Sequence, residues 1–310
     1  MSSVKIFSGH ATKYLAEKIA QSYGKPLGEV THQTFSDGEM CPYFSESVRG
    51  CDVFIIQSTF PPADNFMELL LLIDGAKRAS AKYVTVVVPY FGYARQDRKD
   101  KPRVAIAAKL MANLLTAAGA DRIMTCDLHA DQIQGFFDIP LDHLDGTSIF
   151  IPYLKALNLD NIIFASPDVG GVKRTRAFAK FFDAEMVVCD KHRKRANEVA
   201  SMRLIGDVEG KDVIMVDDLI DTGGTMCKAA ALLKEKGANS VRAVVTHGVL
   251  SGKAYENIEN SVLEELVITD SLPLRGESSK IKVLTIADLF AKAIRKIHDH
   301  ESISSLFIQA

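Results

Sequence analysis

The sequence has no tryptophan, and its cysteines are odd in number and lack the spacing of a disulfide framework or a zinc site. Five cysteines are scattered along the chain without metal-ligand spacing, so we expect small buried thiols in a reducing compartment at Cys41, Cys51, Cys126, Cys189 and Cys227. No apolar run is long enough to span a bilayer, and the first residues lack the organisation of a signal peptide. These absences favour a cytoplasmic protein without membrane contact.

An excess of one charge is also missing. The 37 Lys and Arg residues are balanced by 39 Asp and Glu residues, a formal net charge of −2. This balance argues against nucleic acid or an anionic membrane as partner, so any bound phosphate must be held by local groups. With 310 residues, 47% apolar and 25% charged, the chain is expected to be globular with about two domains.

Short apolar runs alternate with helical patterns along most of the chain. Strands are predicted over 53–57, 84–88, 123–126, 162–165, 186–189, 213–216 and 241–246, and helices over 65–79, 104–118 and 171–182. The predicted strands are apolar on both faces, which is typical of parallel sheets covered by helices on both sides. The fold class is therefore α/β, with ligands expected at the carboxyl ends of the strands.

Two parts of the chain share one order of elements. Asp127 and Asp131 follow the predicted strand 123–126 at the same offsets at which Asp217 and Asp221 follow the strand 213–216. This repetition predicts two copies of one α/β unit joined between residues 142 and 153. We divide the chain into an N-terminal domain, 1–146, and a C-terminal domain, 147–310.

The most informative pattern follows the strand 213–216. Two acids come first, then Asp-Thr-Gly-Gly-Thr, then a helical pattern; the residues are Asp217, Asp218, Asp221, Thr222, Gly223, Gly224 and Thr225. The glycines let backbone N–H groups converge on an anion, to which a helix N-terminus adds partial positive charge. The acids suit hydroxyls or a metal beside that anion, so the pattern indicates a phosphorylated pentose. The alternative, an ordinary capped turn, needs fewer acids and glycines.

A second candidate anion turn follows the strand 162–165. It consists of Asp168, Val169, Gly170 and Gly171, with Lys173 and Arg174 close behind in the sequence. The paired glycines suit a diphosphate and Asp168 suits a divalent cation, whereas the alternative is a plain turn capped by an aspartate. The two turns together predict a sugar phosphate held beside a diphosphate.

Two basic segments, 95–101 and 191–195, each leave a predicted strand without a helical pattern. We expect mobile loops there. Such segments are often only solvated surface, yet phosphoryl transfer is catalysed mainly by positioned cations, which Lys191 and Arg193 could supply. His129 lies two residues after Asp127 and is either an ordinary polar residue or a ligand of Mg²⁺ on a polyphosphate.

Taken together, these motifs resemble the class I PRPP synthetases, or ribose-phosphate diphosphokinases, over nearly the whole chain. The motifs that carry the resemblance are 35–39, 93–99, 127–129, 166–171, 191–193, 217–225 and 246–248. The resemblance implies two tandem type I phosphoribosyltransferase-like domains, each a mainly parallel sheet flanked by helices. It also implies transfer of the β,γ-diphosphoryl group of ATP to the 1-hydroxyl of ribose 5-phosphate, which gives PRPP and AMP for nucleotide biosynthesis.

The resemblance assigns roles to individual residues. Lys191 and Arg193 are assigned to catalysis, and Mg²⁺ is assigned to His129 and Asp168. ATP is assigned to Asp37, Gly38, Glu39, Arg95 and Gln96, and the diphosphate loop consists of Asp168, Val169, Gly170 and Gly171. Ribose 5-phosphate is assigned to Arg193, Asp217, Asp218, Asp221, Thr222, Gly223, Gly224 and Thr225. A homo-oligomer is implied, a hexamer built from dimers with the ATP site shared between subunits. Phosphate and ADP are candidate effectors.

Two other readings stay open. A phosphoribosyltransferase shares the sugar-phosphate turn but does not need a duplicated half. A non-catalytic synthetase-associated subunit carries an insertion near the catalytic loop, and the spacing from Lys191 to Asp217 shows none. The family pattern is departed from at Asp100-Lys101-Pro102-Arg103, which leaves the shape of the flap after Arg95 undetermined.

Overall fold

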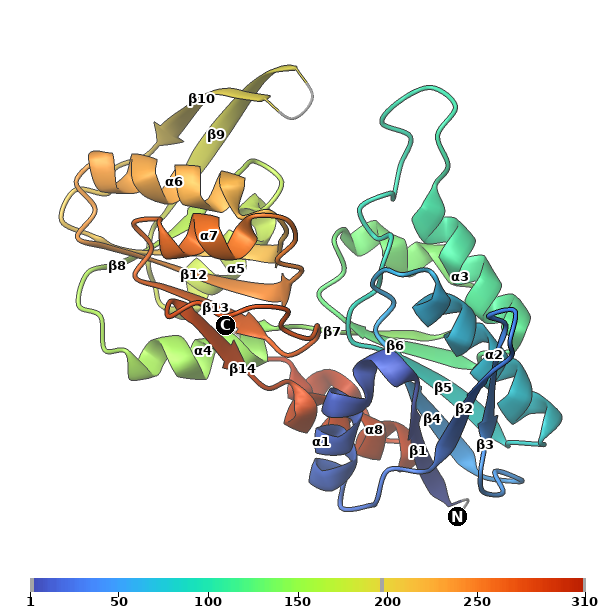
Figure 1. Ribbon diagram of the computed structural model, residues 1–310. Coiled ribbons are helices and arrows are strands. Elements are labelled where there is room, and N and C mark those ends of the chain that lie inside the picture. The colour runs from blue at the N-terminus through green and yellow to red at the C-terminus, as the bar shows by residue number, and fades with distance from the viewer. Residues whose placement is uncertain (1–2, 196–197, 309–310) are drawn as a thin grey trace. The chain divides into compact units, whose positions relative to one another are not determined.

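The computed structural model describes residues 3–195 and 198–308, and the side chains of residues 191–201 lie outside this description. The chain forms two compact units (Figure 1). The first consists of Met1–Asp145 and Ile286–Phe307, and the second mainly of Gly146–Thr285. The change from one unit to the other after Asp145 lies within the predicted junction, whereas residues 286–307 return to the first unit.

The first unit is built on a five-stranded parallel sheet in the order β1-β4-β5-β6-β7. The strands are β1 (Val4–Ser8), β4 (Asp52–Ile56), β5 (Tyr83–Val88), β6 (Arg122–Cys126) and β7 (Leu141–Leu144). A separate antiparallel hairpin comprises β2 (Val30–Thr34) and β3 (Met40–Phe44). The helices are α1 (Lys13–Tyr23), α2 (Asp64–Arg78), α3 (Ala107–Ala118) and α8 (Ala287–His298), with short 3₁₀ turns at His10–Thr12, Asp131–Phe136 and Ile303–Leu306.

The second unit is built on a seven-stranded sheet in the order β10-β9-β8-β11-β12-β13-β14. Its strands are β8 (Ile162–Ser166), β9 (Met186–Arg195), β10 (Glu198–Ile205), β11 (Asp212–Ile220), β12 (Ser240–Gly248), β13 (Glu265–Thr269) and β14 (Ile281–Leu284). All neighbours are parallel except β9 and β10, which pair antiparallel. The helices are α4 (Thr147–Ala156), α5 (Val172–Phe181), α6 (Gly224–Glu235) and α7 (Ala254–Glu259).

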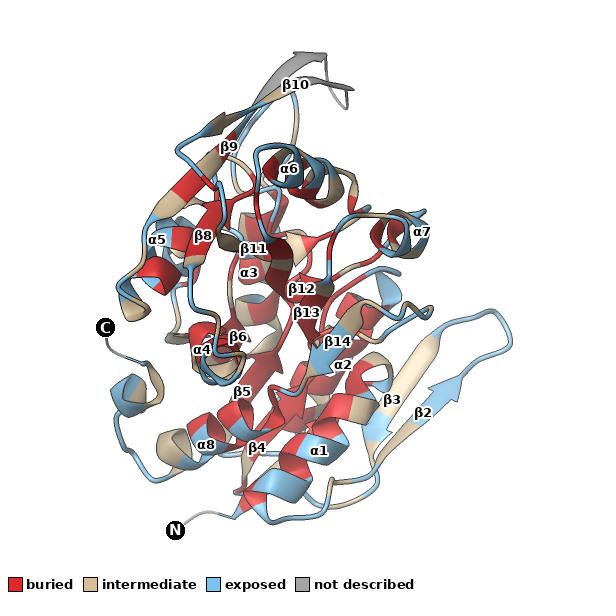
Figure 2. Ribbon diagram, turned by 90° about the vertical axis from the view of Figure 1, so that its left-hand side faces the viewer, coloured by how far each residue is buried: buried red, intermediate tan, exposed pale blue. Residues whose placement is uncertain are grey.

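Successive side chains of β11 show why its apolar run has no polar face. Val213 and Met215 belong to one buried cluster with Ala229 and Leu233 of α6, whereas Ile214 and Val216 belong to another with residues of α4 and α5. Neighbouring residues of a strand point to opposite faces of the sheet, so both faces must be apolar where helices cover both. Figure 2 shows the resulting buried strands between partly exposed helices. The predicted layered α/β architecture is confirmed.

The order of strands reverses beside β8. The chain passes from β8 through α5 to β9 on one side, and β11 then pairs with β8 on the other. The turns that leave β8 and β11 therefore diverge at neighbouring strand ends, which is the arrangement that opens a ligand crevice in α/β sheets. Beyond Met215, β11 pairs with β12 but no longer with β8. The strand continues to Ile220 rather than ending at Val216, so Asp217 and Asp218 lie on a strand segment beside this opening.

Two further differences concern the basic segments. Residues 191–195 continue β9 and pair with β10, with Lys191 opposite Met202, so the expectation of an irregular loop from residue 191 is wrong for this backbone. The antiparallel partner satisfies the backbone groups, and β10 lies at the sheet edge, where charged residues are well tolerated. Residues 95–101 do form an irregular connection. The helix after it begins at Ala107 instead of 104 because Pro102 and the positive φ of Arg103 (66°) interrupt the pattern.

The last helix, α8, packs on α1 within the first unit. Asp288 accepts a hydrogen bond from the Ser22 hydroxyl (2.6 Å), and the Arg295 guanidinium donates to the Tyr23 carbonyl (2.6 Å) while lying 4.5 Å from the Tyr23 ring centroid. Apolar residues on one side of α8 are buried, among them Phe290 and Ile294. The sheet of the first unit thus depends on a helix supplied by the end of the chain.

The cysteines are free thiols, as predicted, and three of the five are buried: Cys51, Cys126 and Cys189. Burial raises the pKa of the Cys189 thiol to about 11, so this side chain stays protonated near neutral pH. Cys41 and Cys227 are half-buried. In the part of the chain that the structure describes, we find no helix with the length and apolar content that a bilayer crossing requires.

We expect Phe290→Ala to lower the free energy of unfolding of the first unit by about 3–5 kcal/mol, because a fully buried aromatic ring is lost from the α8 contact. Thermal and urea unfolding would measure the change. Lys292→Ala, an exposed site on the same helix, is the matched control. Equal stability of the two variants would contradict a stabilising role of α8.

Candidate active site

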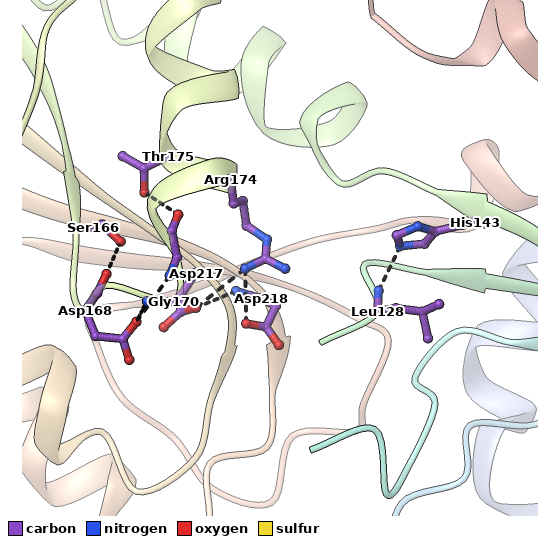
Figure 3. A network of polar contacts seen from close by, with 10 residues as sticks. Leu128, His143, Ser166, Asp168, Gly170, Arg174, Thr175, Asp217 and Asp218 are labelled. Atoms are coloured by element: carbon purple, nitrogen blue, oxygen red, sulfur yellow. Dashed lines mark hydrogen bonds and ion pairs between the residues drawn. The ribbon is translucent and has the colours of Figure 1, made fainter. Parts of the chain in front are cut away.

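The turn after β8 is organised by the Asp168 carboxylate. Its Oδ1 accepts hydrogen bonds from the backbone N–H groups of Gly170 (2.9 Å) and Gly171 (3.2 Å). The Ser166 hydroxyl donates to the Asp168 carbonyl (2.6 Å), which closes the turn from the strand side (Figure 3). In this form of the protein, the two N–H groups that the sequence assigned to a diphosphate are bonded to Asp168. The capped turn, the alternative noted from the sequence, is therefore present.

Arg174 joins this turn to β11. From the first turn of α5, its Nη1 donates to Asp218 Oδ1 at 3.2 Å and lies 3.8 Å from Asp217 Oδ1 (Figure 3). The sequence placed Arg174 near a bound diphosphate, but its guanidinium contacts these two acids. The Asp218 side chain is 6% exposed and that of Asp217 22% exposed, so the buried member of the pair is the one closer to the cation.

Gly171 lies against Ser166 at the end of β8 and within van der Waals reach of Asp217 on β11. A Cβ added at Gly171 would stand 2.8 Å from the Ser166 hydroxyl oxygen and 3.9 Å from Asp217 Oδ1. At the first of these distances a side chain at position 171 would displace the Ser166 hydroxyl, whereas the second distance is ordinary van der Waals contact. The turn after β8 and the acids of β11 are therefore direct neighbours, which the interpretation as one composite site requires.

The environment of Asp217 opposes its ionisation. Burial and the neighbouring Asp218 carboxylate raise the pKa of Asp217 well above its ordinary value, and Arg174 offsets this only in part. Asp217 Oδ1 also accepts the backbone N–H of Asp218 at 2.9 Å. A carboxylate held in this way gains stability from any hydrogen-bond donor or cation that arrives beside it. Strongly perturbed carboxyls in a crevice are typical of functional sites.

The turn after β11 has the form that the sequence predicted for an anion cradle. Gly223 adopts a left-handed conformation (φ 75°) and caps α6, which begins at Gly224. The N–H groups of a helix's first turn have no partner within the helix, and they form the positive end of its dipole. The predicted buried face of α6, with Met226, Ala229, Ala230 and Leu233, is confirmed.

The first unit carries His129, which the resemblance assigns to Mg²⁺. Asp127 follows β6 with φ 39°, and the next N–H, of Leu128, donates to Nε2 of His143 on β7 (2.8 Å), so that Nε2 is unprotonated (Figure 3). His143, which the sequence did not single out, thereby fixes the turn that presents His129 as an exposed side chain. Only its place on the strand next to β6 could have indicated this role.

The residues assigned to ATP are exposed on the first unit. Asp37, Gly38 and Glu39 form the tip of the β2–β3 hairpin, where Asp37 Oδ1 accepts the Glu39 N–H (3.0 Å) and Gly38 has φ 98°. Arg95 and Gln96 lie in the connection after β5. Lys191 and Arg193, which the resemblance assigns to catalysis, lie on β9, and both side chains are outside the described part of the structure.

The structure thus brings together, in the second unit, the turn of Asp168–Gly171 and the acids and glycines of 217–225. A search of the described residues finds no group of three or more His, Cys, Asp and Glu side chains able to hold a metal ion. Asp168 retains its second carboxylate oxygen, Oδ2, without a hydrogen bond among the described residues. One such oxygen fits Mg²⁺, which commonly takes one or two protein carboxylates plus substrate phosphates.

The fold defines a class: a tandem pair of phosphoribosyltransferase-like α/β domains, the second of which places the turn after β8 beside the acids of β11. Residues 4–119 match the family model of the N-terminal domain of ribose phosphate pyrophosphokinase, and residues 170–308 that of the phosphoribosyl synthetase-associated domain. The chain belongs to the ribose-phosphate pyrophosphokinase family.

Individual relatives support this assignment over the full length. A ribose-phosphate pyrophosphokinase of Porphyromonas gingivalis is 55% identical over 97% of both chains, and one of Campylobacter jejuni is 55% identical over 99% of this chain and 100% of its own. The crystal structure of phosphoribosylpyrophosphate synthetase from Mycobacterium smegmatis superposes with a TM-score of 0.91 at 39% identity, covering 96% of this chain and 100% of that chain. The expected fold is confirmed.

We expect Asp217→Asn to stabilise the protein as the pH rises. Since the pKa of Asp217 is raised by folding, its contribution to stability is full below the unfolded pKa and is lost as pH increases through the folded pKa. The amide keeps an Oδ1 acceptor for the Asp218 N–H and does not ionise. Denaturant unfolding between pH 5 and 9 should show a gain in the free energy of unfolding over the unmodified protein that grows with pH. A gain independent of pH would contradict this account.

Proposed function

We propose that this protein is a ribose-phosphate diphosphokinase that transfers the β,γ-diphosphoryl group of ATP to the 1-hydroxyl of ribose 5-phosphate. The products are PRPP and AMP, and the setting is cytoplasmic nucleotide biosynthesis. The observation that carries the proposal is the adjacency of the turn after β8 to the acids of β11, where Arg174 contacts Asp217 and Asp218. The proposal is supported by relatives that are named for this activity and are 55% identical to this chain over nearly its full length.

In this proposal the turn after β11 binds the sugar phosphate. The N–H groups at the start of α6, with Thr222, Gly223, Gly224 and Thr225, receive the 5-phosphate, and Asp221 flanks them. Asp217 accepts hydrogen bonds from the ribose hydroxyls, which satisfies a carboxylate that is costly to ionise alone. Asp218, which the resemblance assigns to the same ligand, is buried beside Arg174, and its backbone N–H donates to Asp217 Oδ1.

The diphosphate is assigned to the turn of Asp168, Val169, Gly170 and Gly171. Its N–H groups must first be released by Asp168 Oδ1, because one N–H cannot serve both acceptors fully. The residues assigned to hold Mg²⁺ are Asp168 and His129, and the cation would neutralise the charge of the polyphosphate. Asp168 would then serve as a ligand in place of its hydrogen bonds to the turn.

Catalysis is assigned to Lys191 and Arg193, with Arg193 also contacting ribose 5-phosphate. Phosphoryl transfer by direct attack of a hydroxyl requires little covalent chemistry from the protein, so positioning and added positive charge supply most of the rate. ATP is assigned to Arg95 and Gln96 and to the hairpin tip of Asp37, Gly38 and Glu39. We place that tip at the ATP site of a neighbouring subunit in a homo-oligomer, a hexamer built from dimers, with phosphate and ADP as effectors.

One assay tests the proposal directly. The purified chain is incubated with ATP, Mg²⁺ and ribose 5-phosphate, and nucleotides and sugar phosphates are separated by ion-exchange chromatography. AMP and PRPP should appear in equal amounts and only when ribose 5-phosphate is present. Formation of ADP in their place, or no turnover, would contradict the proposal, and consumption of PRPP with a nucleobase would favour a phosphoribosyltransferase.

Lys191→Ala should lower turnover by about 10² or more while leaving ribose 5-phosphate affinity nearly unchanged, as expected for a cation that acts on the transition state. Steady-state kinetics and equilibrium binding of ribose 5-phosphate separate the two effects. Lys180→Ala, an exposed lysine of α5, provides a matched loss of charge. Unchanged turnover in Lys191→Ala would remove this residue from catalysis.

A further inference from the structure

The turn that begins α6 is held by a neighbouring segment to which no role has been assigned. After β12 the chain folds back over this turn: the N–H groups of Val249 and Leu250 donate to the Ile220 carbonyl (3.0 and 3.2 Å), and that of Ser251 donates to the Asp221 carbonyl (3.1 Å). These bonds join the backbone of one loop to that of the other. The position of the cradle is therefore set by residues about thirty positions later in the chain.

Two side chains of this segment contact the cradle itself. The Ser251 hydroxyl donates to Asp221 Oδ1, and the Asn257 Nδ2 donates to the Thr222 carbonyl at 2.8 Å. Helix α7, which carries Asn257, also lies under Gly223: a Cβ added at this glycine would stand 3.6 Å from Ile258 Cγ1 and 3.7 Å from Asn257 Cβ. The cradle thus has a floor and two polar ties.

Helix α7 is itself fixed from its other side. The Glu259 carboxylate accepts hydrogen bonds from the hydroxyl of Ser278 (2.5 Å) and from the backbone N–H (3.0 Å) and hydroxyl (2.7 Å) of Ser279, bonds that lower its pKa. The Tyr255 hydroxyl accepts the Arg275 N–H at 3.0 Å. A helix of only six residues has little stability of its own, so these contacts are what make it a firm support.

We propose that Ser251 and Asn257 are positioning residues for ribose 5-phosphate, which hold the β11–α6 turn in the conformation that admits the 5-phosphate. The inference rests on the proposed function of that turn. Ser251 acts on a specific hazard. A carboxylate near a helix N-terminus is attracted to the same N–H groups and dipole as a phosphate, so an unrestrained Asp221 would compete with the ligand. The Ser251 hydroxyl keeps that carboxylate occupied.

Asn257 acts on the backbone. Its amide donor fixes the orientation of the Thr222 carbonyl, and with it the peptide plane whose N–H belongs to Gly223. An N–H group that points at an anion contributes only if its peptide plane is held in place before the anion arrives. Neither side chain is proposed to touch the substrate.

The test uses the full chain and ribose 5-phosphate as the probe, with calorimetric binding in the absence of ATP and steady-state kinetics in its presence. Asn257→Ala and Ser251→Ala should each raise the Kd and KM for ribose 5-phosphate about fivefold, the equivalent of one hydrogen bond, and leave the KM for ATP unchanged. Asn257→Asp should be worse than Asn257→Ala, because a carboxylate oxygen then faces the Thr222 carbonyl oxygen. Ser251→Thr, which keeps the hydroxyl, should restore binding.

Glu256→Ala is the matched control, since this residue of α7 is exposed and its carboxylate lies 3.9 Å from the Lys253 ammonium on the same helix end. Wild-type affinity in both Asn257→Ala and Ser251→Ala overturns the inference while leaving the proposed function intact. Equal weakening of ATP and ribose 5-phosphate, or a Ser251→Thr variant as poor as Ser251→Ala, assigns a general structural role and overturns it as well. If the unmodified chain does not bind ribose 5-phosphate, the proposed function fails and this inference with it.

Discussion

The contact of Arg174 with Asp217 and Asp218 is the interaction on which the site of the second unit depends. Two adjacent carboxylates repel each other, and burial makes their charges costlier still. A guanidinium 3.2 Å from one and 3.8 Å from the other makes the pair tolerable and ties α5 to β11. Because the compensation is incomplete, the site retains a demand for donors beside Asp217. A ligand with hydroxyl groups can donate hydrogen bonds to the Asp217 carboxylate and so compensate the charge that Arg174 leaves uncompensated.

The sheet topology explains why this contact is possible. The turns after β8 and β11 diverge at adjacent strand ends, and β11 extends past the point where β8 has left it. Acids placed on that stretch, which pairs with β12 but no longer with β8, lie beside the neighbouring turn and are tied to it by Arg174. Chemistry that joins a sugar phosphate to a diphosphate thus follows from one reversal of strand order.

The layers of both units could be predicted from the sequence because apolar runs and helical periods report local burial. The composite character of the site could be predicted too, since both turns have distinctive glycines and acids. The course of 191–195 could not: a run of cations has no strand signature, and only pairing with β10 makes it a strand. His143 behind the His129 turn and Ser251 over Asp221 were equally hidden, because each is defined by a contact and not by a pattern.

The return of α8 to the first unit has a consequence for synthesis of the protein. Helix α1 buries Leu15 and Ile19, and its partner α8 is encoded within the last 24 residues of the chain. A ribosome therefore delivers the whole second unit before it delivers the missing piece of the first. Until α8 is synthesised, the side of α1 on which it packs is exposed, and chaperones and proteases have access to it.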